Sequence, residues 1–427
     1  MLRVLLITRE PWRNDSNEGS VLSSWFNDQP MELAQIYCKP GMPDSKCCKH
    51  FFQLTDQMAA KNLLKRQPMG QVIDLSSANK TEEVVAASEK EKKSFYDFFR
   101  RHNWASFFLA QELLWCLANW KSEALVKFVD DFQPDMILAP LCYSRYVMAI
   151  QRWVAKRLKK PMAGIVWDDL YSLNQGHISP VFWLHRLLQR RSVKKTVKLC
   201  DRMYTLSPQQ AEVYEKQFQR PFGVLPKAGD LPAKGIQREE ESIRFLYAGG
   251  IYYGRMETLR QIAQTLASLN QQGYRCQLDV YTNSPDAQML EDAGVCQVHA
   301  AVPAEELKEL YHHSHVAIHV EGFERAYILQ TQMSFSAKIV DCLSSGCAML
   351  AVCPKSNCGY RYLQECKAAV CVDQLSELPA SVEMLVKDHA QRKLWAQRAL
   401  DCLQANHSSE RVKPLIHQEL TAVAGRE

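Results

Sequence analysis

The stretch from Pro226 to Arg255 reads PKAGDLPAKGIQREEESIRFLYAGGIYYGR and decides the fold class. Its first part, residues 226–242, combines prolines and glycines with a run of charged residues, which is typical of a linker. A short apolar strand (243–248) follows and ends at Gly249 and Gly250. The pattern of a strand, glycines and then a helix is typical of parallel α/β proteins. The linker therefore separates two α/β domains, residues 1–225 and 243–405, in a chain of 427 residues.

Predicted strands and helices alternate on both sides of this linker. Nearly continuous apolar runs, such as Leu2–Thr8, are typical of strands that are buried on both faces of a parallel sheet. Residues 1–225 are predicted to carry a helical insertion at about 70–131, whose large aromatic side chains would face either a core or a membrane. Residues 406–427 are predicted to form a helix that packs back on the N-terminal domain. The sequence thus predicts two Rossmann-like, doubly wound domains facing across a cleft, with C-terminal helices.

Composition and charge exclude several classes of protein. Hydrophobic residues make up 47% and charged residues 23%, which is typical of a globular chain and not of a disordered one. The net charge of +5 is too small to demand a nucleic-acid partner, although it would suit an anionic small ligand or an anionic membrane surface.

The cysteines indicate a reducing compartment. The chain has 15 of them, an odd number, and no C-x-x-C motif, so we expect free thiols in a cytoplasmic protein. The N-terminus MLRVLLITREPW does not fit a signal peptide, and no run of 18 apolar residues predicts a membrane-spanning helix.

Common signatures of other enzyme classes are absent. The sequence has no G-x-x-x-x-G-K-[ST], G-x-G-x-x-G, H-E-x-x-H or G-x-S-x-G motif. This disfavours a P-loop NTPase, an ordinary dinucleotide oxidoreductase, a zincin and an α/β-hydrolase. The histidines at 312, 313, 315 and 319 are crowded, but they lack a recognisable ligand spacing and are interpreted as core or interface residues in preference to a metal site.

Two segments of the second half favour an anion site. Arg255 follows the glycine pair close to a predicted helix start, where a guanidinium would add to the positive end of the helix dipole. Ser334, Ser336 and Lys338 cluster where another helix is expected to begin, in the sequence SFSAKIVDCLSSG. Hydroxyls, an ammonium and exposed N–H groups there could hold a diphosphate. The alternative for each is a solvated surface group, and Lys338 with Asp341 could be a surface ion pair of little value.

Together these segments resemble the donor-binding half of retaining GT-B glycosyltransferases, most closely family 4-like enzymes of bacterial polysaccharide biosynthesis. In that family an acidic residue on a helix is followed five residues later by glycine and a buried strand, as Asp341, Gly346 and CAMLAV are here. The family's second acidic residue lies eight positions earlier, where this chain has Met333, and Glu321 or Glu324 could replace it.

The resemblance implies a role for each candidate residue. The donor, a nucleotide-diphospho-sugar, would be bound without metal or other cofactor. Asp168 and Glu324 are the implied catalytic residues, with Glu324 contacting the sugar, and Asn17 and Gly19 belong to the implied acceptor loop. For Asp168 the alternative is a turn or helix cap. The implied donor-binding residues are Gly249, Gly250, Arg255, Ser334, Ser336, Lys338 and Asp341.

The implied reaction is transfer of the sugar, with retention, to a saccharide or a lipid-linked saccharide in cell-surface polysaccharide or lipopolysaccharide biosynthesis. The basic stretches 156–160 and 186–198 could touch the cytoplasmic face of a membrane, or be solvated helix faces. Two other functions stay open: an inactive GT-B protein that binds or regulates, and a GT-B nucleotide-sugar epimerase.

Overall fold

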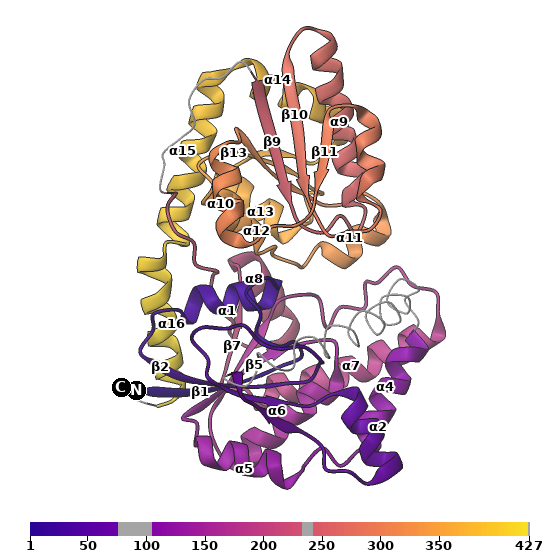
Figure 1. Cartoon of the computed structure of the whole chain (residues 1–427), viewed down its shortest axis with the longest axis vertical. Coiled ribbons are helices and arrows are strands. Elements are labelled where there is room, and N and C mark those ends of the chain that lie inside the picture. The colour runs from indigo at the N-terminus through magenta and orange to yellow at the C-terminus, as the bar shows by residue number, and fades with distance from the viewer. Residues whose placement is uncertain (76–104, 233–241, 426–427) are drawn as a thin grey trace.

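The computed structural model describes residues 1–75, 105–232 and 242–425 and forms two α/β domains (Figure 1). The N-terminal domain contains an eight-stranded sheet in the order β4-β3-β2-β1-β5-β6-β7-β8. All its neighbouring strands are parallel except β3 and β4. The strands are β1 (Leu2–Thr8), β2 (Met31–Tyr37), β3 (His50–Gln53), β4 (Gln71–Ile73), β5 (Met136–Leu141), β6 (Met162–Val166), β7 (Arg202–Thr205) and β8 (Gly223–Val224).

The C-terminal domain has a six-stranded parallel sheet in the order β11-β10-β9-β12-β13-β14. Its strands are β9 (Ser242–Ala248), β10 (Arg275–Tyr281), β11 (Cys296–His299), β12 (Val316–Val320), β13 (Ala348–Val352) and β14 (Val370–Val372). In both sheets the order reverses beside the first strand, β1 or β9, and this reversal is where α/β proteins usually bind ligands.

Helices flank both sheets. Those of the N-terminal domain are α1 (Asn17–Phe26), α2 (Asp56–Lys65), α4 (Ala105–Leu117), α5 (Glu123–Phe132), α6 (Arg145–Leu158), α7 (Pro180–Leu199) and α8 (Pro208–Phe218). Those of the second half are α9 (Arg255–Gln271), η2 (Ala287–Ala293), α10 (Ala304–His312), α11 (Arg325–Thr331), α12 (Lys338–Leu343), α13 (Cys358–Glu365), η3 (Leu375–Glu377), α14 (Leu378–Lys387), α15 (His389–Asn406) and α16 (Ser409–Val423).

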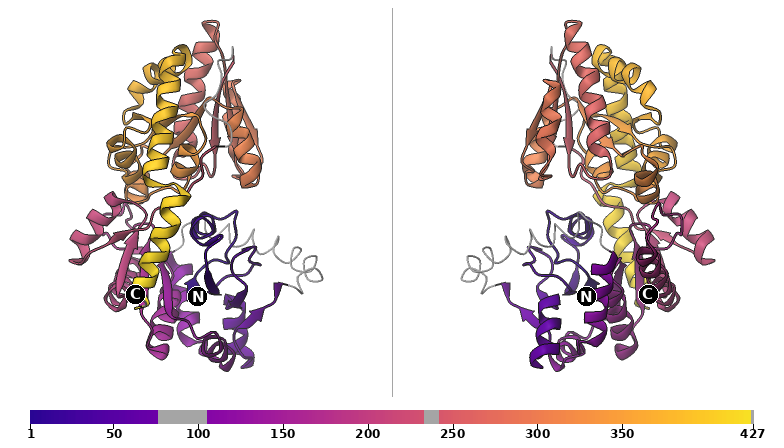
Figure 2. Two further views of the ribbon diagram at one scale, coloured as in Figure 1. Left: turned by 90° about the vertical axis from the view of Figure 1, so that its left-hand side faces the viewer. Right: turned by 90° about the vertical axis from the view of Figure 1, so that its right-hand side faces the viewer.

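The two last helices connect the domains. In Figures 1 and 2, α15 lies along the C-terminal domain and α16 runs down beside the N-terminal domain. Glu419 of α16 accepts hydrogen bonds from Arg202 (3.0 Å) and from the Tyr204 hydroxyl (2.8 Å). Apolar side chains of α16, such as Ile416 and Leu420, are fully buried in the same core cluster as Val4 of β1.

The chain passes between the domains twice, in the linker and at the junction of α15 with α16, and these two segments lie against each other. Gly229 N donates to His407 O (2.8 Å), and Ser409 N donates to Gly229 O (3.2 Å). The His407 ring lies 2.8 Å from the Tyr362 hydroxyl and 2.9 Å from Lys227 O. The linker and the junction of α15 with α16 therefore form one hydrogen-bonded unit.

Two sequence predictions are wrong in detail, and one helix was not predicted. Residues 17–20, predicted as a loop, form the first turn of α1, because Ser16 Oγ caps the helix by accepting from Gly19 N (3.0 Å). Residues 71–73 of the predicted helical insertion form strand β4, and helix α11 (Arg325–Thr331) had not been predicted. Residues 76–104 of the insertion and residues 233–241 of the linker lie outside the described residues.

No helix in the described ranges is long and apolar enough to cross a bilayer.

Candidate donor site and domain contact

The glycine loop after β9 is shaped around one lysine. Gly249 has φ +141°, a conformation that L-residues with a side chain rarely adopt. A Cβ atom at Gly249 would lie 1.7 Å from Lys338 Nζ, so only glycine leaves room for this ammonium group. Gly250 follows, and its carbonyl accepts from the Tyr247 hydroxyl (2.7 Å). The loop therefore brings Lys338, from the first turn of α12, onto the carboxyl end of β9.

Lys338 is a cation without a hydrogen-bond partner among the described residues. Its Nζ lies over the ring of Tyr247, 5.3 Å from the ring centroid. Burial, and next the guanidinium of Arg255, lower the pKa of Lys338 to about 8. A partly buried ammonium with open donor positions is well suited to bind an anion.

Arg255 is held differently from the sequence prediction. Its Nε and Nη2 donate to the two carboxylate oxygens of Glu321 at 3.0 and 2.8 Å. Glu321 is 1% exposed and directly follows β12, so this is a buried two-point pair. The fork of Arg255 is thus occupied by Glu321, whereas Lys338 has no hydrogen-bond partner in the part of the chain that the structure describes.

His319 lies beside this pair of cations. It belongs to β12 and is 3% exposed. Burial, then the charges of Arg255 and Lys338, lower the pKa of His319 to about 3, so its imidazole is neutral at physiological pH. This histidine adds polarity to the site without adding charge.

Asp168 and Ser334 form a hydrogen bond between the domains. Ser334 Oγ donates to Asp168 Oδ1 at 2.7 Å, although the residues are 166 positions apart. Burial raises the pKa of Asp168, and the neighbouring Asp169 raises it further. The predicted catalytic carboxylate therefore lies at the domain contact. A helix does begin at this cluster, because α12 starts at Lys338. Its N-cap residue is Ala337, so Ser334 and Ser336 lie just before the helix and do not cap it.

Asp169, the neighbour of Asp168, has a structural role. It is 3% exposed, and its Oδ1 accepts from Arg186 Nη2 (3.0 Å) and from the backbone N–H groups of Tyr171 and Ser172. These contacts fix the loop between β6 and α7.

Tyr143 lies near Asp168 at the carboxyl edge of the N-terminal sheet. It follows β5 and is 46% exposed, and desolvation raises the pKa of its phenol. The carboxylates of Asp168 and Asp169, which follow β6, raise this pKa further. The hydrogen bond between Asp168 and Ser334 connects this edge of the sheet to the C-terminal domain.

Asp341 is paired with a lysine of the linker. Its Oδ1 lies 2.5 Å from Nζ of Lys227, whose side chain is 5% exposed. Lys227 also donates to Ala337 O (3.3 Å), one residue before α12. Sequence reasoning missed Lys227, because no local pattern links residues 114 positions apart.

The surroundings of Met333 explain why this position does not hold the acidic residue of the family that the sequence resembles. It is 8% exposed and packs in the core cluster of the N-terminal domain that contains Leu170 and Tyr214. Its carbonyl accepts from Gln210 Nε2 (2.7 Å), which also donates to Trp167 O (2.7 Å). An apolar side chain suits this contact between domains.

The other predicted residues are spread out. Glu324 is exposed and is the N-cap residue of α11, with no side-chain cap bond. Asn17 is exposed in α1, and a Cβ at Gly19 would lie 1.9 Å from Arg13 O. Between them, Glu18 has its pKa raised to about 8, mainly by burial and then by Glu10. Glu18 was not predicted, and its burial gives no signal in the sequence.

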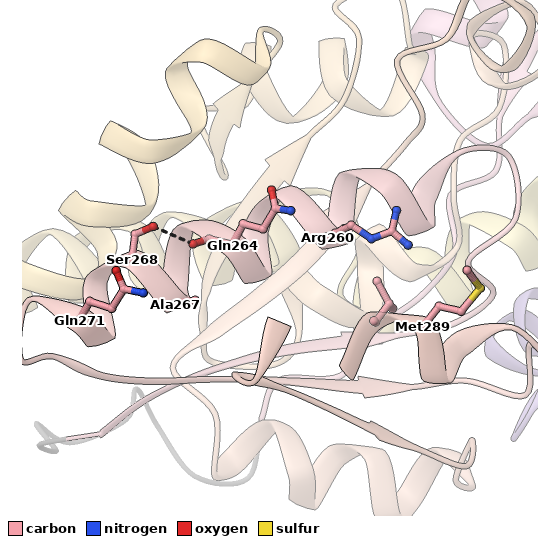
Figure 3. Close-up of a pocket in the computed structure, with 7 residues that line it drawn as sticks. Arg260, Gln264, Ala267, Ser268, Gln271 and Met289 are labelled. Atoms are coloured by element: carbon pink, nitrogen blue, oxygen red, sulfur yellow. Dashed lines mark hydrogen bonds between the residues drawn. The ribbon is translucent and has the colours of Figure 1, made fainter. Parts of the chain in front are cut away.

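Within residues 1–75, 105–232 and 242–425, no cluster of three or more histidine, cysteine or acidic side chains is placed to hold a metal ion. A cavity of about 370 Å³ lies between α9 and η2 (Figure 3). It contains none of the predicted site residues; those that line it are Arg260, Gln264, Ala267, Ser268, Gln271, Met289 and Leu290.

Comparison with known proteins identifies the architecture. No protein-family model and no curated sequence matches the chain. Among solved structures, sucrose-phosphate synthase from Thermosynechococcus elongatus superposes with a TM-score of 0.61 and 11% identity over 100% of both chains. The α,α-trehalose 6-phosphate synthase from Burkholderia multivorans gives 0.60 and 12% over 100% of this chain and 99% of that one.

A third structure is the UDP-forming α,α-trehalose-phosphate synthase from Burkholderia xenovorans in complex with glucose-6-phosphate. It gives a TM-score of 0.57 and 9% identity over 99% of this chain and 100% of that one. Identities this low establish a shared fold. The predicted two-domain Rossmann-like architecture is thereby confirmed as the GT-B fold of these glycosyltransferases.

Proposed function

We propose that the chain is a retaining glycosyltransferase that moves a sugar from a nucleotide-diphospho-sugar to an acceptor hydroxyl. The observation that carries the proposal is the Lys338 ammonium, which lies on Gly249 with no hydrogen-bond partner among the described residues. It stands at the carboxyl end of β9, beside the strand reversal, in a fold that known glycosyltransferases share.

The chemistry explains why a free cation matters. As the bond from the anomeric carbon to the diphosphate breaks, negative charge grows on the leaving oxygens, and a fixed cation there stabilises the transition state. Lys338 would donate to these oxygens directly, and Arg255, held by Glu321, would add positive potential. On this proposal no metal is required.

The remaining residues are assigned by position. Asp341 has a 42% exposed side chain, so it can contact the nucleotide ribose while Oδ1 stays paired with Lys227. Glu324, exposed at the start of α11, would contact the donor sugar. Asp168 and Ser334 would act when the domains close on the donor, because their hydrogen bond spans the domain contact.

We propose a saccharide or a lipid-linked saccharide as the acceptor, in cytoplasmic assembly of cell-surface polysaccharide or lipopolysaccharide. The hexosyl type of the transfer is part of the same proposal. Two of the similar structures are named as synthases of sugar phosphates, and a third is a complex with glucose-6-phosphate, so glucose-6-phosphate belongs in the acceptor panel.

Two measurements test the function. Thermal unfolding is followed with UDP, GDP and their sugars, and we expect at least one to raise the melting temperature, because a ligand stabilises the state that binds it. A flat response across the panel contradicts a donor site. Product analysis then separates the classes: nucleotide released only with acceptor indicates transfer, a changed nucleotide sugar indicates an epimerase, and binding without turnover across the acceptor panel indicates an inactive binding protein.

A further inference from the structure

One exposed face of helix α7 changes from apolar to basic along its length. Near the start of the helix this face carries Val181, Leu184 and Leu187, which are 39%, 52% and 49% exposed. Spacings of three residues place these side chains on one side of the helix. The same face continues into four exposed cations, Arg191, Lys194, Lys195 and Lys198.

This face of α7 carries only positive charges. Helix α7 contains no aspartate or glutamate. None of its four exposed cations forms an ion pair with any residue that the structure describes. The loop before the helix adds two more exposed apolar side chains, Leu173 (49%) and Ile178 (100%). A fully exposed isoleucine beside exposed leucines is unfavourable in water and marks an interaction surface.

The apolar end of α7 lies close to the candidate site. The preceding loop starts at Asp169, next to Asp168, and Gly176 within it packs against α11, where a Cβ atom would lie 3.6 Å from Leu329 Cδ1. Figure 1 shows this loop rising from α7 toward the C-terminal domain. A surface that receives this end of α7 would therefore lie beside the entrance to the donor domain.

We propose that this face, defined by Leu173, Ile178, Val181, Leu184, Leu187, Arg191, Lys194, Lys195 and Lys198, docks on an anionic lipid bilayer. Apolar side chains would enter the headgroup region, and the cations would pair with lipid phosphates. Charge complementarity favours an anionic bilayer as the partner. In such a bilayer anionic headgroups lie above apolar acyl chains, and on this face of α7 cations lie next to apolar side chains. The inference extends the proposed function. It rests on that function in one respect only, which is that a lipid-linked acceptor would be taken from this membrane.

The other basic stretch of the chain provides a contrast. Residues 156–160 end α6 and are largely exposed, but Arg157 is paired with Asp130 (2.6 Å), and no exposed large apolar side chain belongs to the segment. It carries charge without the apolar component and serves as a matched control.

The test is co-sedimentation of the full chain with vesicles of phosphatidylcholine alone or with one third phosphatidylglycerol. We expect binding to the anionic vesicles only. The double variant Lys194→Glu with Lys195→Glu should lose at least about tenfold in partition coefficient, since each cation near an anionic leaflet contributes about a fivefold factor. Leu184→Ser with Leu187→Ser should lose a similar factor, while Lys156→Glu with Lys160→Glu, which changes net charge equally, should bind nearly as the parent.

The result that overturns the proposal is no binding of the parent to anionic vesicles, or equal weakening in the two charge variants, which would make overall charge the cause. Melting temperatures of all variants verify folding, because the substituted side chains are exposed. Nucleotide binding, measured in the same variants without vesicles, should be unchanged; its absence in the parent as well would refute the donor site and leave the membrane result standing.

Discussion

Replacement of Lys338 by methionine should separate nucleotide binding from folding. The substitution keeps the length of the side chain but removes the only charge that lies on Gly249 without a hydrogen-bond partner among the described residues. A hydrogen bond to a charged group contributes about 1.5–3 kcal/mol. We therefore expect the dissociation constant of the nucleoside diphosphate to rise by about 10- to 150-fold. The free nucleoside, which lacks phosphates, should bind the variant and the parent equally.

The pH dependence gives a second, independent readout. With a pKa of about 8, Lys338 is mostly charged at pH 7 and mostly neutral at pH 9. Diphosphate affinity of the parent should fall as pH rises through 8, by up to about tenfold between pH 7 and 9. The methionine variant should lack this inflection. Isothermal titration calorimetry at both pH values measures it.

The same lysine makes a stability prediction of opposite sign. Its pKa in the folded state lies below the usual 10.5, so the unfolded chain binds more protons between pH 8 and 10.5. The free energy of unfolding should therefore rise with pH in this window. Methionine should stabilise the ligand-free protein at pH 7 by about 1–3 kcal/mol, allowing for solvent screening. Unchanged diphosphate affinity together with unchanged stability would refute the assignment of Lys338.

Three further predictions concern Gly249, the ion pair of Lys227 with Asp341, and Glu18. Gly249→Ala should abolish diphosphate binding, because the new Cβ would overlap the ammonium group of Lys338. Gly273→Ala is the control: this glycine has φ +96° and no atom within 4 Å of the position that its Cβ would take, so the variant should show only backbone strain of about 1–3 kcal/mol. Equal diphosphate binding in the two variants would contradict the overlap. Asp341→Asn should lower the melting temperature more than Lys227→Met, because it leaves the buried ammonium group of Lys227 without its carboxylate partner. The reverse order would contradict the inference that Asp341 stabilises the buried charge of Lys227. In the parent, the free energy of unfolding should fall as pH rises from about 4.5 to 8, because burial raises the pKa of the Glu18 carboxyl to about 8. Glu18→Gln should remove this fall, and chemical denaturation across the pH range will measure the difference.

The fold was largely predictable because its signals are local. The apolar run Leu2–Thr8, predicted as a strand, matches β1 at both ends, and the strand predicted at 243–248 is β9, Ser242–Ala248. Apolar runs and glycine pairs are signals that depend only on neighbouring residues. Helix α11 was missed because its sequence, RAYILQT, is too short for its apolar period to be recognised.

The site was less predictable because its contacts are long-range. The two glycines and Lys338 were identified, but a single sequence could not show that Arg255 pairs with Glu321 or that Asp168 meets Ser334. Each such pair depends on how sheets and domains pack, and the intervening chain gives no sign of it. The loop conformation predicted for residues 17–20 was wrong for a local reason, because Ser16 caps a helix that begins at Asn17.

The crossing of α16 back to the first domain has a consequence for synthesis. A ribosome makes the N-terminal domain first, yet part of its core, the side chains of Val412, Ile416 and Leu420, is made after all the strands of the second domain. Until then the apolar surface that α16 covers stays open to water and to other nascent chains. We expect the first domain to complete its folding only after α16 has been made, so loss of α16 should affect yield and solubility before it affects chemistry.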